Sequence, residues 1–323
     1  MTSADALGRV VVVVVAWNRS ALLAACLDGL AAQTRPPDAV VVIDNASTDD
    51  SGEVARTHRI GADVRTLPTN LGGAGGFAAG MALALTEHDP GWLWLMDDDT
   101  VPRPGALEGL ADAVGRHADA DRLTVLSSTA VWTDGRIHPM NVSRQRIDAG
   151  AAEKADAGAV GSRAIRTASF VSILLRADAC RAHGLPYADY FIWGDDTEYS
   201  GRLLREGRGL QVSGSVVEHR TKAFGSWQAE PGPRFYNDVR NKTWVFTRSH
   251  AFRWFERIVY GGSVMLGWVR TVLRSRHTRE LLGLGWRGLR DAARSGPRPT
   301  MQVMAGLGEV SDAVAALERG ARR

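Results

Sequence analysis

The sequence predicts an α/β fold in which helices flank a mostly parallel sheet. Apolar runs rich in valine, such as Val10–Ala16 and Ala39–Asp44, are followed by helical patterns at 21–32 and 51–59. Strands that alternate with helices are typical of a parallel sheet. The runs are apolar throughout and do not alternate with polar residues, as expected for strands that are buried on both faces. Both observations favour a Rossmann-like arrangement.

The remaining elements follow in order along the chain. We expect a short strand near 64–67, a glycine-rich loop at 70–76, a helix at 77–87 and a strand at 92–96 that ends in three aspartates. A helix to about residue 116 and a strand near 123–128 come next. Residues 134–162 show no clear period and predict a loop. After it we expect a strand at 168–175, helices at 177–183 and from Asp195, a strand near 216–219, and a helical tail from Phe235.

Charge is distributed unevenly along the 323 residues. The net charge is +3, yet residues 240–298 hold 13 Lys or Arg against three acids, which leaves the rest with 26 bases and 33 acids. A basic C-terminal region on an acidic body points to an anionic surface or ligand. Two cysteines make no disulfide framework, which fits a reducing cytosol. No stretch reaches about 18 uninterrupted apolar residues, so the sequence predicts no membrane span.

Acidic residues follow two of the predicted strands. Asp44 ends the second strand, and the triplet Asp97–Asp99 ends the strand at 92–96. Ligands of parallel sheets bind at the carboxyl ends of the strands, so these carboxylates should lie near one another. Three successive aspartates repel one another unless a cation holds them, and oxygen donors suit Mg²⁺ or Mn²⁺. The alternative is a solvated acidic turn that caps the next helix.

A second acidic cluster, Asp195 to Glu198, begins a predicted helix, and His219 ends a later strand. A carboxylate at a helix start in a cleft can act as a general base, although acids there also simply favour the helix dipole. A lone histidine is often structural, but a position at a strand end beside a metal site favours a ligand. The glycines of residues 70–76 are weak evidence for phosphate binding, and tight packing of the loop against a helix start is the alternative.

Taken together, these motifs resemble those of glycosyltransferase family 2, over roughly residues 8–250. In order, they are Trp17-Asn18-Arg19, residues 42–49, Asn70-Leu71-Gly72, Asp97-Asp98-Asp99, residues 194–198 and His219. Within that family the chain is similar to the actinobacterial galactofuranosyltransferases. Residues 70–81 and 234–242 most resemble the enzyme that initiates cell-wall galactan synthesis.

The resemblance implies a role for each matching residue. Arg19, Asp44 and Asn70 would hold the uridine part of the donor, and Asp97 and Asp99 would serve the diphosphate and its metal. His219 would complete the metal site. Asp196 would be the catalytic base, and Trp193 and Asp195 would contact the acceptor. Asp195 stands where many relatives have Glu, so the base could be either acid of the pair.

The resemblance also implies the fold, the activity and the location. It implies a GT-A catalytic domain over residues 1–233, with a donor half at about 8–130 and an acceptor half at about 165–233, and then a helical region at 234–323. It further implies inverting, metal-dependent transfer of galactofuranose from its UDP donor to a rhamnosyl-GlcNAc-diphospho-polyprenol. A rhamnosyltransferase or another sugar-specific family 2 enzyme is the alternative. A nucleotidyltransferase is disfavoured because Trp17-Asn18-Arg19-Ser20 replaces a glycine-rich basic loop. A non-catalytic sugar-nucleotide-binding protein is disfavoured because both the acids and the base are present.

The acceptor and the basic tail together predict a peripheral position on the cytoplasmic side of the plasma membrane. Arginines that alternate with Trp and Leu suit helices lying on an anionic membrane surface, and such binding would be salt-sensitive. Packing of these helices on the catalytic domain is the alternative. No nucleic acid is expected as a partner, because no recognisable nucleic-acid module accompanies the basic stretch.

Overall fold

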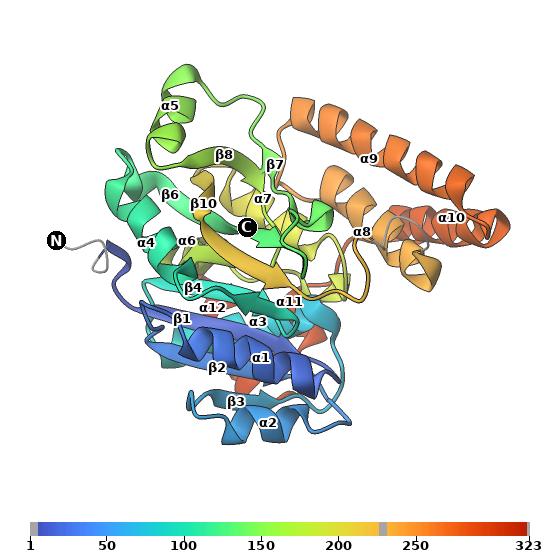
Figure 1. The fold of residues 1–323 in the computed structure, drawn as a ribbon. Coiled ribbons are helices and arrows are strands. Elements are labelled where there is room, and N and C mark those ends of the chain that lie inside the picture. The colour runs from blue at the N-terminus through green and yellow to red at the C-terminus, as the bar shows by residue number, and fades with distance from the viewer. Residues whose placement is uncertain (1–5, 226–230, 322–323) are drawn as a thin grey trace.

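The structure is a computed structural model that describes residues 6–225 and 231–321, and it confirms the α/β fold (Figure 1). The catalytic domain predicted at 1–233 therefore includes two short segments, 1–5 and 226–230, that lie outside the described residues. The strands are β1 (Val10–Ala16), β2 (Ala39–Asp44), β3 (Asp63–Thr66), β4 (Trp92–Asp97), β5 (Thr100–Pro102), β6 (Leu123–Val131), β7 (Arg144–Gln145), β8 (Ser162–Thr167), β9 (Ile173–Arg176) and β10 (Arg208–His219). The helices are α1 (Ser20–Ala31), α2 (Ser51–Thr57), α3 (Gly72–Glu87), α4 (Ala106–Arg116), α5 (Ala151–Ala159), α6 (Ala177–His183), α7 (Asp195–Leu203), α8 (Phe235–Thr247), α9 (Trp254–Arg274), α10 (Thr278–Arg294), α11 (Thr300–Val303) and α12 (Glu309–Gly320).

The strands form one ten-stranded mixed sheet in the order β3-β2-β1-β4-β9-β6-β10-β8-β7, with β5 paired to β10. The half made of β3, β2, β1 and β4 is parallel throughout. β9 lies antiparallel between β4 and β6, while β6 and β10 are again parallel. The predicted mostly parallel sheet is therefore confirmed in its first half and interrupted by β9 in its second.

Two hydrophobic cores cover the two faces of the sheet. Alternate residues of β1 point to opposite faces, so Val12 packs with α1 and α4 while Val13 packs with α3. The core on the α3 face also takes in residues of α7 and α12. The strands are buried on both sides, as the continuous apolar runs predicted.

Three expectations about local structure are wrong. The segment 134–162, expected as a loop, contains the short strand β7 and the helix α5, whose only fully buried residue is Ala157, so no apolar period marks it. The strand expected at 168–175 begins only at Ile173, as β9, because residues 168–172 are irregular chain that follows β8. The glycine-rich segment is helical from Gly72, because α3 packs so closely on β1 that a Cβ at Gly76 would lie 2.4 Å from Val15.

The C-terminal region is helical, as predicted. α8 packs against α10, whereas α11 and α12 return to the catalytic body, where Val310 and Val314 of α12 join the core beside α3. α9 and α10 extend away from the sheet as a pair of long helices (Figure 1). Within residues 6–225 and 231–321, no helix is long and apolar enough to cross a membrane.

Candidate functional site

The carboxyl ends of three neighbouring strands bring two of the predicted acids to one edge of the sheet. β1 lies between β2 and β4, with Ala16 opposite Asp44 and Val15 opposite Asp97. Asp44 and Asp97 therefore flank the end of β1 on its two sides. This is the edge at which parallel sheets bind their ligands.

The aspartates after β4 also organise the loop after β1. Oδ2 of Asp98 accepts a hydrogen bond from the backbone N–H of Trp17 at 2.9 Å. The guanidinium of Arg19, which is expected to hold uridine, reaches the aspartates, with Nη1 at 3.2 Å from Asp98 and 2.5 Å from Asp99. Asp98 thus has a structural role in the loop that follows β1. The cation of Arg19 partly offsets the charge of the triplet.

Asp99 and His219, two of the three predicted metal ligands, lie together. Nε2 of His219 is 3.2 Å from Oδ1 of Asp99, and both side chains are buried. Nδ1 of His219 lies 2.8 Å from Oδ1 of Asn141 and can donate a hydrogen bond to it, while Nε2 faces Asp99. The ring of His138 packs on that of His219 with centroids 4.9 Å apart. Asn141 therefore orients His219 in the manner of a residue behind a metal ligand.

Burial and neighbouring charges shift the pKa values of the three aspartates in the triplet. Burial raises the pKa of Asp98 to about 6. Burial, then the charges of Asp99 and Asp98, raises the pKa of Asp97 well above its ordinary range, and Asp195 adds to this effect. Burial would also raise the pKa of Asp99, but the hydrogen bond and charge of His219, together with Arg19, lower it below its usual value. The start of α7 and the end of β4 therefore belong to one electrostatic site.

The donor set of this site fits a divalent metal. Oδ1 of Asp99 is buried and lacks a well-oriented hydrogen bond, and no described residue donates one to the carboxylate of Asp97. Carboxylate oxygens and a neutral imidazole nitrogen are donors that Mn²⁺ and related ions accept. Asp97, Asp99 and His219 do not, however, all lie within 4.8 Å of one another. The structure thus joins Asp99 with His219 and leaves Asp97 beside them.

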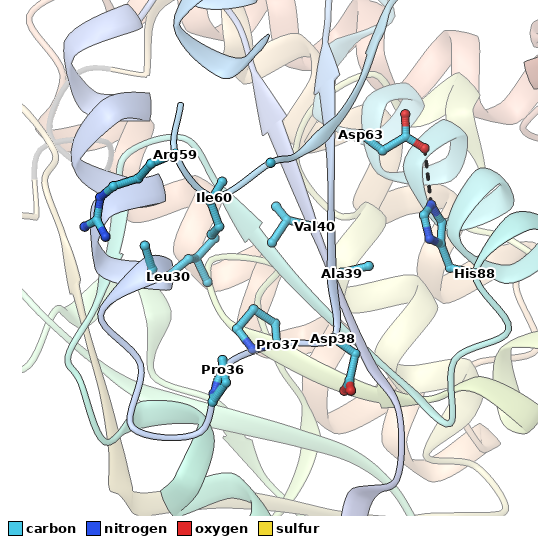
Figure 2. Close-up of a pocket in the computed structure, with 12 residues that line it drawn as sticks. Leu30, Pro36, Pro37, Asp38, Ala39, Val40, Arg59, Ile60, Asp63 and His88 are labelled. Atoms are coloured by element: carbon cyan, nitrogen blue, oxygen red, sulfur yellow. Dashed lines mark hydrogen bonds and ion pairs between the residues drawn. The ribbon is translucent and has the colours of Figure 1, made fainter. Parts of the chain in front are cut away.

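One other group of three possible ligands occurs in the described part of the chain, namely Asp63, Glu87 and His88. Arg65 already supplies the positive charge there, because it pairs with Asp63 and, at 2.9 Å, with Glu87. Figure 2 shows Asp63 and His88 beside a cavity of about 420 Å³ at residues 36–40. That cavity lies at the beginning of β2, the opposite end from Asp44, and contains none of the predicted site residues.

The two residues expected to bind the donor nucleoside beyond Arg19 are fixed by loop contacts. Asp44 accepts hydrogen bonds from the N–H of Ser47 at 2.9 Å and the hydroxyl of Thr66 at 3.2 Å. Asn70 accepts one from the N–H of Gly72 at 2.7 Å. Asn45, which was not predicted, connects the two loops, because it accepts from Leu71 N–H and donates to the carbonyl of Gly72, both at 2.9 Å.

The acids at the start of α7 differ in their surroundings. Asp195 is buried, and burial and the charge of Asp196 raise its pKa to about 8. Asp196 is half-buried; its Oδ1 accepts the N–H of Thr197 at 2.6 Å, and burial raises its pKa. Glu198 is a structural residue, held by Arg202 at 3.1 Å and by the hydroxyl of Ser249 at 2.8 Å. Trp193 precedes α7 with a left-handed φ of 67°.

Comparison with known proteins identifies the family. Residues 11–169 match the model described as glycosyl transferase family 2. The chain is 33% identical over 260 residues to galactofuranosyltransferase GlfT1 of Mycobacterium tuberculosis, a match that covers 73% of this chain and 81% of the relative. The chain belongs to glycosyltransferase family 2. It is 34% identical over 218 residues to GlfT1 of Mycolicibacterium smegmatis, and that match spans 60% of this chain and 65% of the relative's length.

Two solved structures that hold a nucleotide sugar share the fold of this enzyme. S. aureus TarS 1-349 in complex with UDP-GlcNAc aligns with a TM-score of 0.61 at 14% identity, over 96% of this chain and 88% of that one. Mannosyltransferase PcManGT from Pyrobaculum calidifontis, in complex with GDP-Man and Mn²⁺, aligns with a TM-score of 0.54 at 17% identity, over 97% and 85%. These likenesses confirm the predicted GT-A fold.

Three asparagines of the site region were not predicted. Asn45 follows β2 directly, and its position at a strand end was the signal that could have identified it. Asn241 lies within the motif at 234–242 that carried the family resemblance. Asn141 lies in a segment without periodicity, and nothing local distinguishes it from other loop residues.

Proposed function

We propose that this enzyme transfers galactofuranose from UDP-galactofuranose to a rhamnosyl-GlcNAc-diphospho-polyprenol, with inversion and with the aid of a divalent metal. The observation that carries the sugar and the acceptor is the 33% identity to GlfT1 over 260 residues. The site supports the chemistry, because Asp97 ends β4 at the carboxyl edge of the sheet, His219 contacts Asp99, and the charge of Asp195 at the start of α7 adds to the raised pKa of Asp97.

On the donor side, Arg19, Asp44 and Asn70 would bind the uridine diphosphate, and Asp97, Asp99 and His219 would hold the metal. The metal, when bound, supplies positive charge to the departing diphosphate. Asn141 orients the ring of His219 so that Nε2 faces Asp99. Asp98 and Arg19 hold the loop after β1 against the same edge, which keeps the nucleotide-binding residues in place.

On the acceptor side, Trp193 would form a wall for the sugar, and Asp195 would contact it. Asp196 would take the proton of the attacking hydroxyl as general base. It is the more exposed of the two acids, and its raised pKa brings its basicity toward that needed near neutral pH. Asp195, with a pKa of about 8, carries a proton at pH 7 and suits a hydrogen-bond donor to the acceptor.

The lipid-linked acceptor would place the enzyme at the cytoplasmic face of the plasma membrane as a peripheral protein. The basic C-terminal region supports this proposal, since its excess of arginine is attracted to anionic lipids. The alternative is that these helices only pack on the catalytic domain.

The test is an assay with a panel of nucleotide sugars, a synthetic lipid-linked rhamnosyl disaccharide and Mn²⁺, followed by mass measurement of the products. We expect one or more hexose units to be added from UDP-galactofuranose. Addition of a deoxyhexose from a rhamnose donor would instead support the rhamnosyltransferase alternative. The proposal would be contradicted if no nucleotide sugar in the panel were hydrolysed or used as a donor.

A further inference from the structure

The outer face of α9 is apolar and exposed. Its inner face packs on the body through Glu256, Tyr260 and Val264. On the opposite face the side chains of Ile258, Met265, Leu266, Val269 and Leu273 are between 54% and 75% exposed. Their spacing of 7, 8, 11 and 15 residues from the first places them on one side of the helix. A continuous stripe of large aliphatic side chains is rare on the surface of a soluble monomer and marks an interaction site.

The next helix continues this surface. Leu282, Trp286 and Leu289 of α10 lie one turn apart and are 57%, 71% and 42% exposed. Arg279 and Arg290 lie beside this stripe on the helix surface, so α10 alternates apolar and cationic groups. The two helices form the part of the molecule that extends farthest from the sheet (Figure 1).

The basic residues of 240–298 differ in their contacts. Six of them are engaged within the protein: three donate to backbone carbonyls and three pair with carboxylates, namely Arg240, Arg248, Arg257, Lys242, Arg253 and Arg298. By contrast, Arg270, Arg274, Arg276 and Arg279 form no ion pair with any described residue. These four lie where α9 ends and α10 begins.

We propose that the outer faces of α9 and α10 insert into the interface of a bilayer that contains anionic lipids. The aliphatic stripe would reach the acyl boundary while the four arginines contact headgroup phosphates. At 21 residues α9 is about 31 Å long, and it would lie flat on the membrane. Lipid fits this surface better than a second copy of the chain, because two copies joined by the stripe would bring their unpaired arginines together.

This surface gives membrane binding two components. Six of the 13 basic residues are engaged elsewhere, so the aliphatic stripe has to carry a large share of the affinity, and that share is insensitive to salt. The sequence predicted helices with apolar faces in the acyl boundary and arginines on anionic headgroups, and therefore salt-sensitive binding. With the stripe carrying much of the affinity, the arginines act mainly in the preference for anionic lipids. This inference does not depend on which sugar the enzyme transfers.

The experiment is co-sedimentation of the full chain with phosphatidylcholine vesicles, with and without phosphatidylglycerol. In the stripe variant, Leu266, Val269 and Leu273 are replaced by serine. The matched control places serine at three equally aliphatic, exposed positions elsewhere, Ile137, Ile147 and Met301. In the charge variant, Arg270, Arg274, Arg276 and Arg279 become glutamine. Hydrolysis of soluble UDP-sugar, measured in parallel, reports the catalytic site separately.

We expect the stripe variant to lose at least about ten-fold in partitioning to both kinds of vesicle, because three aliphatic side chains no longer enter the interface. The charge variant should lose mainly its preference for phosphatidylglycerol, and the control should bind as the wild type does. Wild-type-like binding by the stripe variant would overturn the proposal. So would a stripe-dependent dimer in light scattering that binds no vesicles.

A second, independent observation concerns the loop before α7. Phe191, Trp193 and Gly194 have positive φ angles of 61°, 67° and 89°, a backbone conformation that residues other than glycine rarely adopt. Nδ2 of the buried Asn241 lies 2.8, 2.9 and 2.7 Å from the carbonyl oxygens of Tyr190, Ile192 and Trp193, which share its two N–H groups. One side chain of α8 therefore holds three carbonyls of this loop.

The same loop touches the donor side of the site. The carbonyl of Phe191 accepts the N–H of Ala74 at 3.2 Å and lies against Gly72, where a Cβ would approach within 2.0 Å. The loop is thus held between the start of α3 and α8, and its last residue, Gly194, precedes Asp195 and Asp196. We infer that Asn241 is a positioning residue that sets Trp193 and the start of α7 relative to the donor. This inference rests on the proposed roles of Trp193 and Asp196.

The test uses two variants, Asn241→Asp, which keeps the shape of the side chain but loses the N–H donor, and Asn241→Ser. The control is Thr243→Val, because the hydroxyl of Thr243 forms a hydrogen bond only within α8. UDP affinity should stay within about two-fold, whereas kcat for transfer should fall at least about ten-fold and the acceptor KM should rise. Thr243→Val should behave as the wild type. Unchanged transfer kinetics in either folded variant would overturn the inference. Parallel loss of UDP binding, transfer and melting temperature would show a role in folding alone. Failure of the wild type to transfer any sugar would instead count against the proposed function.

Discussion

At the scale of single residues, the environment of each acid sets what it can do. Both carboxylate oxygens of Asp98 accept hydrogen bonds, one from the N–H of Trp17 and one from Arg19. Neither oxygen is therefore free of a partner for a ligand. The sequence predicted the triplet and its place at a strand end correctly. It could not assign Arg19 to the aspartates, because that contact depends on how the loop after β1 folds over the end of β4.

Asp195→Asn tests the buried carboxyl at the start of α7. In the folded protein its pKa is about 8, against about 4 in the unfolded chain. Between these values the folded state holds a proton that the unfolded state has lost, so wild-type stability falls as pH rises through this window. Asparagine removes the titration. We therefore expect the variant to gain stability relative to wild type by roughly 1 kcal/mol per pH unit from pH 5 to pH 8.

Chemical denaturation of metal-free protein at several pH values measures this difference. Asp178→Asn, at an exposed carboxylate, serves as the control and should differ from wild type by no more than about 0.5 kcal/mol at any pH. A constant difference for Asp195→Asn across the window would show that its carboxyl is ionised in the folded state.

Asn141 provides a second test at this scale. Asn141→Ala removes the acceptor that fixes the Nδ1 proton of His219, so the affinity for Mn²⁺ should fall by about 10- to 100-fold. Asn141→Asp retains an acceptor and should bind the metal at least as tightly as the wild type. Calorimetric titration of Mn²⁺ in the presence of UDP measures both. Equal affinity in wild type and Asn141→Ala would remove Asn141 from the proposed metal site.

At the scale of elements, strands and long helices with a clear period were predictable, and short or glycine-rich ones were not. β1, β2 and β4 were found because burial on both faces demands continuous apolar residues. The beginning of α3 was missed because glycine disfavours helices in isolation, and only close packing on β1 explains its use there. α5 and β7 carry no pattern that distinguishes them from a loop.

Two adjacent glycines at the start of α3 test whether close contacts explain the use of glycine there. Gly72 has φ +71°, and a Cβ there would lie 2.0 Å from the carbonyl of Phe191, so Gly72→Ala should destabilise the protein by about 2–4 kcal/mol. Gly73 is helical with open space around its Cα, so Gly73→Ala should be neutral or stabilise by up to about 1 kcal/mol. Urea unfolding measures both. A destabilised Gly73→Ala would contradict the packing explanation.

At the scale of the whole molecule, buried contacts tie the C-terminal region to the catalytic body. Arg166 of β8 and Glu256 of α9 form a fully buried pair, with Nε and Nη2 of the arginine at 2.6 and 3.0 Å from the carboxylate. Arg166 also donates to the carbonyls of Gly201 and Ala251. The domain boundary predicted at residue 233 remains a prediction. These contacts show that the beginning of α9 is packed against the catalytic body through buried polar groups.

Glu256→Gln tests this connection. It leaves the guanidinium of Arg166 buried without its counter-charge, so the free energy of unfolding should fall by about 3–5 kcal/mol. The double variant Arg166→Met/Glu256→Gln removes both charges and should lose less than Glu256→Gln alone. Urea unfolding of the wild type, Glu256→Gln, Arg166→Met and the double variant measures the coupling. Additive losses would mean that the pair is not coupled in solution.

The most direct test of the central claim is the rate of transfer by Asp196→Asn beside wild type, with UDP-galactofuranose, the lipid-linked acceptor and Mn²⁺. If the start of α7 supplies the base for a reaction assembled at the ends of β1, β2 and β4, the variant should bind UDP normally while kcat falls by about 10²–10⁴. Asp195→Asn should be impaired less, and EDTA should stop the wild type. Near-normal turnover by Asp196→Asn, or full wild-type activity in EDTA, would contradict the proposed site.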